Sequence, residues 1–419
     1  MKKSEKLSNA FKVKIEKLVY GGAGIGRHQG KVVFVPFSAP GDHLLVKPVE
    51  EKKTFIRAEI VRIIKPGSGR TTPVCPHFQR CGGCHWQQLE YSRQLEAKRQ
   101  ILEEILQHRF PQTREIPITM KACAQPLEYR SRARVQLRGA GSKASVGFFR
   151  CASHTVEDVE SCPLLRRSLN EALNSLRQYK LKVDTDASPQ EMDMACSEEE
   201  GTWATAHVGE HAIEGVTTLI GTGRREEVLL KRKVGEFLYS VTATVFFQAN
   251  DFMVPELVAL VGELAKDAGS QSALDLFAGV GLFTLPLARQ FSEVIAIENS
   301  LSACRLCSAN AKAAGFGHVR IICADVSSWL ESEQAAAQSR FDLIVLDPPR
   351  IGAGSGIMEQ IRMYAPKTII YVSCDPQTLA RDLSKLSPCE YRIDFVQGLD
   401  MFPQTYHFET VVRLIRSNS

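Results

Sequence analysis

The sequence predicts a multidomain chain whose C-terminal part is a doubly wound, Rossmann-like parallel α/β sheet. From about residue 245, short apolar strands alternate with helical segments. Parallel strands that are buried on both faces appear as short apolar runs, and the helices between them cover the two faces of the sheet. Two other patterns precede this one: period-two strands at the N-terminus, and mixed helices and strands in the middle. The expected parallel strands are Ala273–Phe277, Val294–Ile297, Val319–Cys323, Leu343–Leu346 and Thr368–Val372.

Residues 1–66 are expected to form an OB-like β-barrel. Short strands with alternating apolar and polar side chains, separated by turn residues, are typical of small barrels. The glycine-rich stretch Gly21–Gly26 superficially matches a dinucleotide-binding loop, but no helix follows it, and we reject that interpretation. The expected strands are Phe11–Glu16, Lys31–Pro36, His43–Val49 and Phe55–Ile64.

Positive charge is concentrated at the N-terminus. Residues 1–70 hold 15 Lys and Arg against 6 Asp and Glu, a net charge of +9 in a chain whose total is +5. This uneven distribution favours a polyanionic partner, most simply a nucleic acid. A solvated lysine-rich surface explains the charge equally well, so charge alone leaves both interpretations open.

Two further regions lie between the barrel and the α/β sheet. Residues 67–120 begin with a Pro/Gly/Ser linker, continue through a cysteine-rich segment and include a helix expected from Tyr91 to His108. Residues 121–244 predict a central α+β domain, in which the strand Arg130–Arg138 carries arginines on one face, suited to nucleic-acid phosphates. The α/β domain is expected to span residues 245–419.

The composition predicts a cytoplasmic protein without a membrane span. Hydrophobic residues make up 44% of the chain and charged residues 24%, and no run of 18 or more apolar residues occurs. The charged start, Met1–Lys6, lacks the apolar stretch that a signal peptide needs. Because the cytoplasm is reducing, the 12 cysteines are interpreted as thiols, metal ligands or nucleophiles.

Four cysteines form a candidate metal centre. Cys75, Cys81 and Cys84 have the spacing C-x5-C-x2-C, and Cys162 stands much later, directly before Pro163. Three close thiolates and one distant thiolate suit an iron–sulfur cluster. A zinc ion also accepts four thiolates, although the absence of a second C-x2-C pair here weighs against an ordinary zinc ribbon. Buried core cysteines are the third interpretation.

A glycine-rich turn follows the first parallel strand, within Asp275–Thr284. Its glycines allow the backbone to approach a ligand closely. Glu298 ends the second strand, where it can accept hydrogen bonds from a ribose, and Asp325 follows the third strand, near an adenine edge. This order is typical of S-adenosylmethionine binding. An NAD-binding fold would normally have a third glycine where Thr284 stands, so we expect a methyltransferase.

The fourth parallel strand ends in Asp347-Pro348-Pro349-Arg350. A D-P-P sequence after an apolar strand is similar to a motif of enzymes that methylate nucleobase amines. In those enzymes a tyrosine stacks on the base at the place where this chain has Arg350. A mechanism other than amine methylation is therefore expected.

The fifth strand ends at Cys374, which we predict to be a nucleophile. Carbon 5 of a pyrimidine is a poor nucleophile, and a thiolate that adds to carbon 6 creates the enolate that can accept a methyl group. A base must then remove the carbon-5 proton, and His407 and Glu409 are the candidates near the C-terminus. The alternative for Cys374 is a buried thiol without a chemical role.

These motifs together resemble the RNA uracil-5-methyltransferase family, in particular its 23S ribosomal RNA branch with an N-terminal TRAM domain and an iron–sulfur cluster. The resemblance covers nearly the whole chain. In order along the sequence stand F-Q-x-N (Phe247–Asn250), D-L-F-x-G-x-G, I-E-N, D-P-P-R, S-C-x-P and D-M-F-P-x-T-x-H-x-E.

The resemblance implies a role for each candidate residue. Cys374 is expected to be the nucleophile and Glu409 the proton acceptor. A 4Fe-4S cluster, structural or engaged in gripping folded RNA, is expected on Cys75, Cys81, Cys84 and Cys162. The expected cofactor and uracil pocket consists of Gln248, Phe277, Leu282, Glu298, Asp325 and Asp347.

Four positions depart from the family pattern. Asp375 stands where asparagine is usual, and its negative charge beside Cys374 would raise the thiol pKa unless the carboxylate is turned away or paired. Leu282 replaces a polar residue, so any cofactor contact there must come from the backbone. Gln404 and Tyr406 replace a common histidine and a common glycine near the base.

The resemblance implies a uridine of 23S ribosomal RNA as the substrate. We expect it in a loop or unpaired site, because the base must leave its stack to react. Transfer RNA remains an alternative substrate. A non-catalytic iron–sulfur RNA-binding or assembly protein is the alternative of another class, which the intact Cys374 and Glu409 pair disfavours. We expect a monomer.

Overall fold

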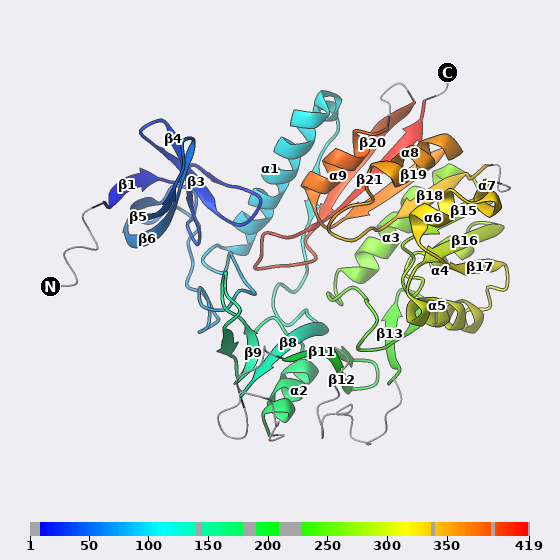
Figure 1. Cartoon of the computed structure of the whole chain (residues 1–419), viewed down its shortest axis with the longest axis horizontal. Coiled ribbons are helices and arrows are strands. Elements are labelled where there is room, and N and C mark those ends of the chain that lie inside the picture. Colours follow the sequence, from blue (N-terminus) through cyan, green and yellow to red (C-terminus); the bar gives the residue numbers. More distant parts are fainter. Residues whose placement is uncertain are drawn as a thin grey trace.

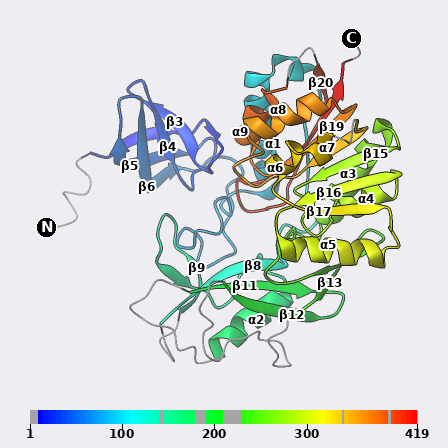
Figure 2. The ribbon, with the colours of Figure 1, turned by 45° about the vertical axis from the view of Figure 1, so that its right-hand side comes forward.

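The structure is a computed structural model, which describes residues 9–139, 145–178, 190–208, 228–336, 340–386 and 390–417. The described strands form four sheets. Figure 1 shows the N-terminal sheet on one side of the molecule, the α/β sheet on the other, and a central sheet below them. Figure 2, turned by 45°, keeps the same separation. None of the helices in the described ranges has the length and apolar character needed to cross a bilayer.

The N-terminal sheet has six strands in the order β1-β5-β6-β4-β3-β2. Alternate side chains of these strands, such as Val33 and Val35 or Leu44 and Val46, are fully buried and fill its interior. The period-two pattern therefore identified this domain correctly. The strands are β1 (Phe11–Lys14), β2 (Lys17–Leu18), β3 (Gly24–His28), β4 (Lys31–Val35), β5 (His43–Glu51) and β6 (Phe55–Lys65).

Helix α1 (Tyr91–Arg109) follows the cysteine-rich segment and agrees with the predicted helix within one residue. Its apolar stripe, including Ile101, Leu102 and Leu106, is buried. A short 3-10 helix (Pro111–Glu115) and strand β7 (Thr119–Lys121) come next. The sequence pattern did not reveal β7, which is only three residues long.

The central domain is built on a five-stranded antiparallel sheet in the order β10-β9-β8-β11-β12. Helix α2 (Arg167–Gln178) packs on the sheet through Leu169, Leu173 and Leu176. A separate hairpin of β13 (Leu230–Val234) and β14 (Phe237–Val241) leads to the α/β domain. The strands of the five-stranded sheet are β8 (Arg132–Arg138), β9 (Ser145–Phe149), β10 (Val156–Asp158), β11 (Gln190–Ser197) and β12 (Thr202–Val208).

The α/β sheet has eight strands in the order β17-β16-β15-β18-β19-β21-β20-β7. All five predicted strands form, and they are parallel: β15 (Ser272–Leu276), β16 (Glu293–Glu298), β17 (Val319–Cys323), β18 (Leu343–Leu346) and β19 (Thr368–Ser373). The fold is the Rossmann-like fold that was predicted. Two strands were not predicted: β20 (Tyr391–Leu399) and the antiparallel β21 (Glu409–Arg416), which lies between β19 and β20.

Helices connect these strands and cover both faces of the sheet (Figure 2). Their buried side chains include Leu257 and Val261 on α3, Ile357 and Ile361 on α8, and Leu379 on α9. The helices are α3 (Val254–Ala265), α4 (Thr284–Ala288), α5 (Leu301–Ala313), α6 (Val326–Leu330), α7 (Glu333–Ala336), α8 (Ser355–Tyr364) and α9 (Pro376–Leu383), with a 3-10 turn at Lys266–Ala268.

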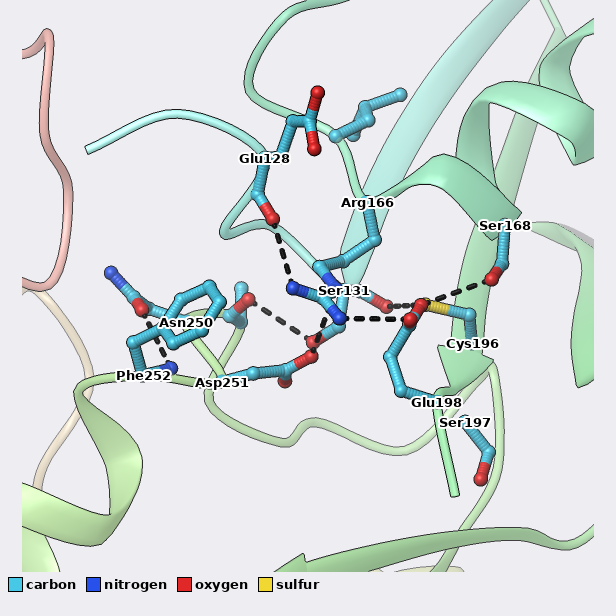
Figure 3. A network of polar contacts seen from close by, with 12 residues as sticks. Glu128, Ser131, Arg166, Ser168, Cys196, Ser197, Glu198, Asn250, Asp251 and Phe252 are labelled. Atoms are coloured by element: carbon cyan, nitrogen blue, oxygen red, sulfur yellow. Dashed lines mark hydrogen bonds and ion pairs between the residues drawn. The ribbon is translucent and has the colours of Figure 1, made fainter. Parts of the chain in front are cut away.

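A polar network fastens the central domain to the start of the α/β domain (Figure 3). Asp251 pairs with Arg232 and lies 3.7 Å from the guanidinium of Arg166. Arg166 also binds Glu198 at 2.8 Å and donates to the carbonyl oxygen of Glu128. Because Asp251 adjoins the F-Q-x-N motif, this network holds that motif against the central domain.

The loop that joins β20 to β21 reaches back toward the middle of the molecule, between the three domains (Figure 1). A fully buried ion pair fixes its start: the Lys98 ammonium on α1 lies 2.5 Å from Asp400 and donates to the carbonyl oxygen of Phe402 at 3.1 Å. Gln94, one turn earlier, exchanges two hydrogen bonds with Gln404, each of 2.9 Å. Helix α1 therefore holds the loop that leads to Glu409.

We predict that Lys98→Met destabilises the protein by about 3–5 kcal/mol, because it leaves the Asp400 charge buried without its partner. The free energy of unfolding in urea measures the effect. Lys17→Met is the matched control, since the Lys17–Glu104 pair is exposed and is worth at most about 1 kcal/mol. Equal losses in the two variants would contradict the role given to the buried pair.

Candidate active site and cysteine-lined cavity

The glycine-rich turn after β15 is held against the end of β16. The backbone N–H of Gly279 donates to Glu298 Oε2 at 3.0 Å, and the N–H of Ser300 donates to Oε1 at 2.8 Å. Gly279 has a φ of +55°, and a Cβ atom at this position would meet open space. The turn thus leaves room directly beside the Glu298 carboxylate, as a ligand at this edge requires.

The other predicted cofactor residues lie at the same carboxyl edge of the sheet, with one exception. Phe277 adopts a φ of +62°, a conformation that is uncommon for non-glycine residues. Asp325 is exposed and caps α6, accepting from the N–H of Ser328 at 2.9 Å. The exception is Leu282, whose side chain packs in the core and whose carbonyl oxygen accepts from the Tyr239 hydroxyl.

Asp347, which follows β18, contacts Gln248, which lies in the segment before α3. The Gln248 amide donates to Asp347 Oδ2 at 3.4 Å, and Gln248 is buried. Burial raises the pKa of Asp347 to about 7. Asp275, one strand away, also has its pKa raised to about 7 by burial, and it accepts a hydrogen bond from Thr284. Thr284, which stands where a third glycine would be, is therefore a buried partner of Asp275.

The antiparallel register of β19 and β21 brings Cys374 and Glu409 together. Ser373 pairs with Thr410, and the next residues outward along the two strands are Cys374 and Glu409. Glu409 is buried, and within the described part of the chain its Oε2 atom has no hydrogen-bond partner. A thiol and an unsatisfied carboxyl group from residues 35 positions apart thus stand side by side at the carboxyl edge of the sheet.

Burial opposes the charged form of both groups. Burial raises the pKa of the Cys374 thiol to about 12, and the nearby carboxylates of Glu409 and Asp347 add to the effect. Burial and Asp347 likewise raise the pKa of Glu409 well above its usual range. Because like charges oppose one another here, ionisation of one acid makes ionisation of the next harder.

Arg350 is the cation that opposes this accumulation of acids, and its charge lowers the pKa of both Cys374 and Glu409. From the sequence, Arg350 stood out only as a replacement for tyrosine and was not among the predicted site residues. A single guanidinium directly after D-P-P, in a site predicted to contain a thiolate and two carboxylates, was the signal that could have identified it.

His407, the other candidate base, is poorly suited to accept a proton. Burial and the charge of Arg350 lower its pKa to about 3. Its ring packs against that of Tyr406, with centroids 4.0 Å apart. Glu409 therefore remains the proposed acceptor.

Both carboxylate oxygens of Asp375, the residue after Cys374, have hydrogen-bond partners. Its Oδ1 atom caps α9 by accepting from the N–H groups of Gln377 at 2.8 Å and Thr378 at 3.1 Å. Its Oδ2 atom accepts from the Tyr20 hydroxyl at 3.0 Å. Asp375 is the weakest of the groups that raise the pKa of Cys374, below burial, Glu409 and Asp347. The carboxylate is thus paired.

The four predicted ligand cysteines, Cys75, Cys81, Cys84 and Cys162, line one largely apolar cavity. Polar groups point at their sulfur atoms: Gln87 donates to Cys84 at 3.2 Å, and the Gly83 N–H donates to Cys81 at 3.4 Å. In the described ranges no three His, Cys, Asp or Glu side chains are grouped so as to hold one metal ion. A single zinc ion needs such a grouping, with sulfurs about 3.8 Å apart for bonds of about 2.3 Å.

An open pocket of about 600 Å³ adjoins this cavity, and Arg130 lines both. Phe148, Phe149 and His154 contribute aromatic rings to the pocket. The expectation that the whole arginine strand faces phosphates is wrong for Arg132, whose buried guanidinium donates to the carbonyl oxygens of residues 242 and 243. Arg134 is exposed but paired with Asp193 and Glu191.

Comparison with known proteins agrees with this geometry. Residues 225–417 match the tRNA (Uracil-5-)-methyltransferase family, and residues 11–68 match the TRAM domain of tRNA (uracil(54)-C(5))-methyltransferase. The chain is 32% identical to the 23S rRNA (uracil(1939)-C(5))-methyltransferase RlmD of Shewanella amazonensis, over 97% of this chain and 96% of that protein. The chain belongs to the RNA uracil-5-methyltransferase family. It is an RNA methyltransferase with an N-terminal TRAM domain.

Two further relatives extend across the whole chain. An RNA methyltransferase of Thermosynechococcus vestitus, named as uncharacterized, is 30% identical, with 97% of this chain and 98% of that protein covered. The Pyrococcus abyssi tRNA (uracil-54, C5)-methyltransferase, solved with S-adenosyl-L-homocysteine, has a TM-score of 0.75 and 25% identity, with 97% of this chain and 100% of that chain covered. The similarity to the Pyrococcus abyssi enzyme therefore extends over all domains of this chain, including the Rossmann-like domain.

We predict that Arg350→Gln moves the rise of kcat/KM with pH about half to one unit toward higher pH, because the thiolate of Cys374 and the carboxylate of Glu409 lose their nearby cation. Methyl transfer measured across the pH range tests this. Arg362→Gln on the surface of α8, where Arg362 pairs with Glu390, is the control. An unshifted profile in Arg350→Gln would show that the cation does not tune these acids.

Proposed function

We propose that this enzyme methylates carbon 5 of a specific uridine in 23S ribosomal RNA, with S-adenosylmethionine as methyl donor. The observation that carries the proposal is the placement of Cys374 beside Glu409 at the edge that also bears Glu298 and the glycine turn. Two relatives named 23S rRNA (uracil(1939)-C(5))-methyltransferase RlmD, from Shewanella amazonensis and Pectobacterium atrosepticum, are each 32% identical to this chain. The transfer RNA enzyme of Pyrococcus abyssi is less similar in sequence, at 25%.

In the proposed reaction the Cys374 thiolate forms a bond to carbon 6 of the uracil. The electrons of the 5,6 double bond become an enolate, and carbon 5 then takes the methyl group. Glu409 removes the carbon-5 proton, the double bond re-forms, and the carbon–sulfur bond breaks to release the thiolate. The raised pKa of Glu409 suits a carboxyl group that must hold the proton afterwards.

S-adenosylmethionine supplies an electrophilic methyl group on a sulfonium. We propose that Glu298 and Asp325 bind its nucleoside part, and that Gln248, Phe277 and Asp347 line the space shared with the uracil. Leu282 would contribute only shape, since its carbonyl oxygen already accepts from Tyr239. The room beside Gly279 fits a ligand at this edge.

We further propose that Cys75, Cys81, Cys84 and Cys162 hold a 4Fe-4S cluster. The shared cavity and the N–H groups aimed at Cys81 and Cys84 support it. Each thiolate of a cubane cluster would bind a different iron, and all four cysteines line the same cavity. The methyl transfer needs no redox step, so the cluster would be structural or would shape the RNA-binding surface.

The proposed division of labour follows the four regions of the chain. Residues 1–66 and 121–244 bind the RNA, residues 67–120 carry most of the cluster ligands, and residues 245–419 carry out methyl transfer. Arg130 and the aromatic rings of the adjoining pocket suit a splayed nucleotide next to the target uridine.

The substrate is tested by mapping 5-methyluridine in ribosomal and transfer RNA from cells with and without the gene. We expect the loss of one 23S site, its restoration by the wild-type gene, and no restoration by Cys374→Ala. Glu409→Gln should instead accumulate a covalent protein–RNA adduct, because the release step needs the base. Loss of a transfer RNA site would move the assignment to that substrate, and restoration by Cys374→Ala would refute the nucleophile.

We predict that Cys84→Ser lowers the iron content of anaerobically purified protein by more than half, because one corner of the cluster loses its thiolate. Iron and acid-labile sulfide analysis measures this. Cys151→Ser is the matched control, since Cys151 lies beside the carbonyl oxygen of Cys81 but is not one of the four ligands. Zinc in place of iron in the wild-type protein would contradict the cluster assignment.

A further inference from the structure

A loop of the N-terminal barrel reaches the catalytic edge. The Tyr20 hydroxyl, between β2 and β3, donates to Asp375 Oδ2 at 3.0 Å, across 355 positions of sequence. The carbonyl oxygen of Gly22 in the same loop accepts from the Trp86 indole N–H at 2.9 Å. The barrel is thus attached both to the residue after the nucleophile and to the segment that follows the cysteines.

This loop fits closely against the chain that leads to Glu409. Gly22 has a φ of +89°, and a Cβ atom there would lie 2.9 Å from the Tyr406 ring. The rings of Tyr20 and Tyr406 meet edge to face, with centroids 5.3 Å apart. The N–H groups of His85 and Trp86 donate to the carbonyl oxygen of Gln404, each at 3.0 Å. Tyr20 is therefore held in a packed junction.

Asp375 divides its two oxygens between two tasks. Oδ1 is used by the N-terminus of α9, so the carboxylate has a fixed position. Oδ2 faces the barrel, and Tyr20 is its partner there. Because Cys374 immediately precedes Asp375, the orientation and charge of this carboxylate act directly on the thiol.

The groups facing Cys374 come from each element around it. Glu409 begins β21, Asp347 follows β18, Arg350 lies four residues after the end of β18, and Asp375 adjoins the thiol on its own strand connection. Tyr20 faces it from the barrel. Three carboxyl groups thus oppose a thiolate, and Arg350 favours it. A hydrogen-bond donor to one of those carboxylates therefore changes how strongly that carboxylate disfavours the thiolate.

We propose that Tyr20 is a positioning residue for methyl transfer: its hydroxyl donates to the Asp375 carboxylate, holds it at the start of α9 and weakens the effect of its charge on the Cys374 thiol, so that the N-terminal barrel helps to make the thiol reactive. This rests on the proposed role of Cys374. Burial and the Asp375 charge raise the pKa of Tyr20, so the phenol stays protonated and remains a donor throughout the working pH range.

Two substitutions separate this role from simple packing. Tyr20→Phe removes the hydroxyl and keeps the ring, so Asp375 loses its partner and opposes the thiolate more strongly. Asp375→Asn removes the charge, while its side-chain oxygen still caps α9 and its amide can donate to the Tyr20 oxygen. Once the charge is gone, loss of the Tyr20 hydroxyl should no longer affect the thiol.

The test measures alkylation of Cys374 by iodoacetamide against pH, in the full-length protein without RNA, by peptide mass spectrometry. We expect Tyr20→Phe to move the reactivity curve about half to one pH unit upward and Asp375→Asn to move it downward. The double variant should match Asp375→Asn. Tyr364→Phe is the control. It removes a hydroxyl at the end of α8 that donates to the Leu330 carbonyl oxygen, and it should leave the reactivity curve unchanged.

Single-turnover methylation of a 23S ribosomal RNA fragment gives the second readout. Tyr20→Phe should lower the rate at neutral pH about tenfold and less at high pH, with RNA affinity nearly unchanged. An unchanged alkylation curve, or an equal loss of rate in the Asp375→Asn background, would overturn the positioning role. Absence of methylation by the wild-type protein would instead count against the proposed function, and the alkylation curve would still decide on Tyr20.

Discussion

The buried pair of Lys98 and Asp400 is the contact on which the rest of the molecule depends. It joins the helix that follows the cysteine-rich segment to the loop that leads to Glu409, and both charged side chains are fully buried, so water does not solvate either charge. From this point the loop runs through Gln404 and Tyr406, where the barrel and the cysteine segment attach. The geometry of the active site is therefore set by three domains, through one loop of the catalytic domain.

The catalytic edge combines several acids with little positive charge. Burial raises the pKa values of Cys374, Glu409 and Asp347, and the neighbouring carboxyl groups add to the effect on Cys374 and Glu409. A raised thiol pKa leaves less of the reactive thiolate, so each nearby cation or hydrogen-bond donor has a large influence on Cys374.

The sequence predicted much of this and failed for identifiable reasons. Apolar runs located the five parallel strands, and motifs selected Cys374 and Glu409, because both signals are local. Strand β7 was invisible because three residues carry no period, and Arg350 was visible but was not recognised as a charge partner. Asp375, Gln404 and Tyr406 were recognised as departures from the family pattern. Their partners, Tyr20 and Gln94, lie hundreds of positions away, and no local pattern encodes such pairs.

Strand β7 has a consequence for how the protein is made. It is parallel to β20, and Gln397 donates to Thr119 across 278 positions of sequence. On the ribosome, β7 therefore emerges long before its neighbour, and the whole central domain is synthesised while that edge strand has nothing to pair with. Closing the catalytic sheet is a late, long-range step of the kind that slows folding. Until the last strands have been synthesised, the nascent chain has its N-terminal and central domains but not a complete catalytic sheet.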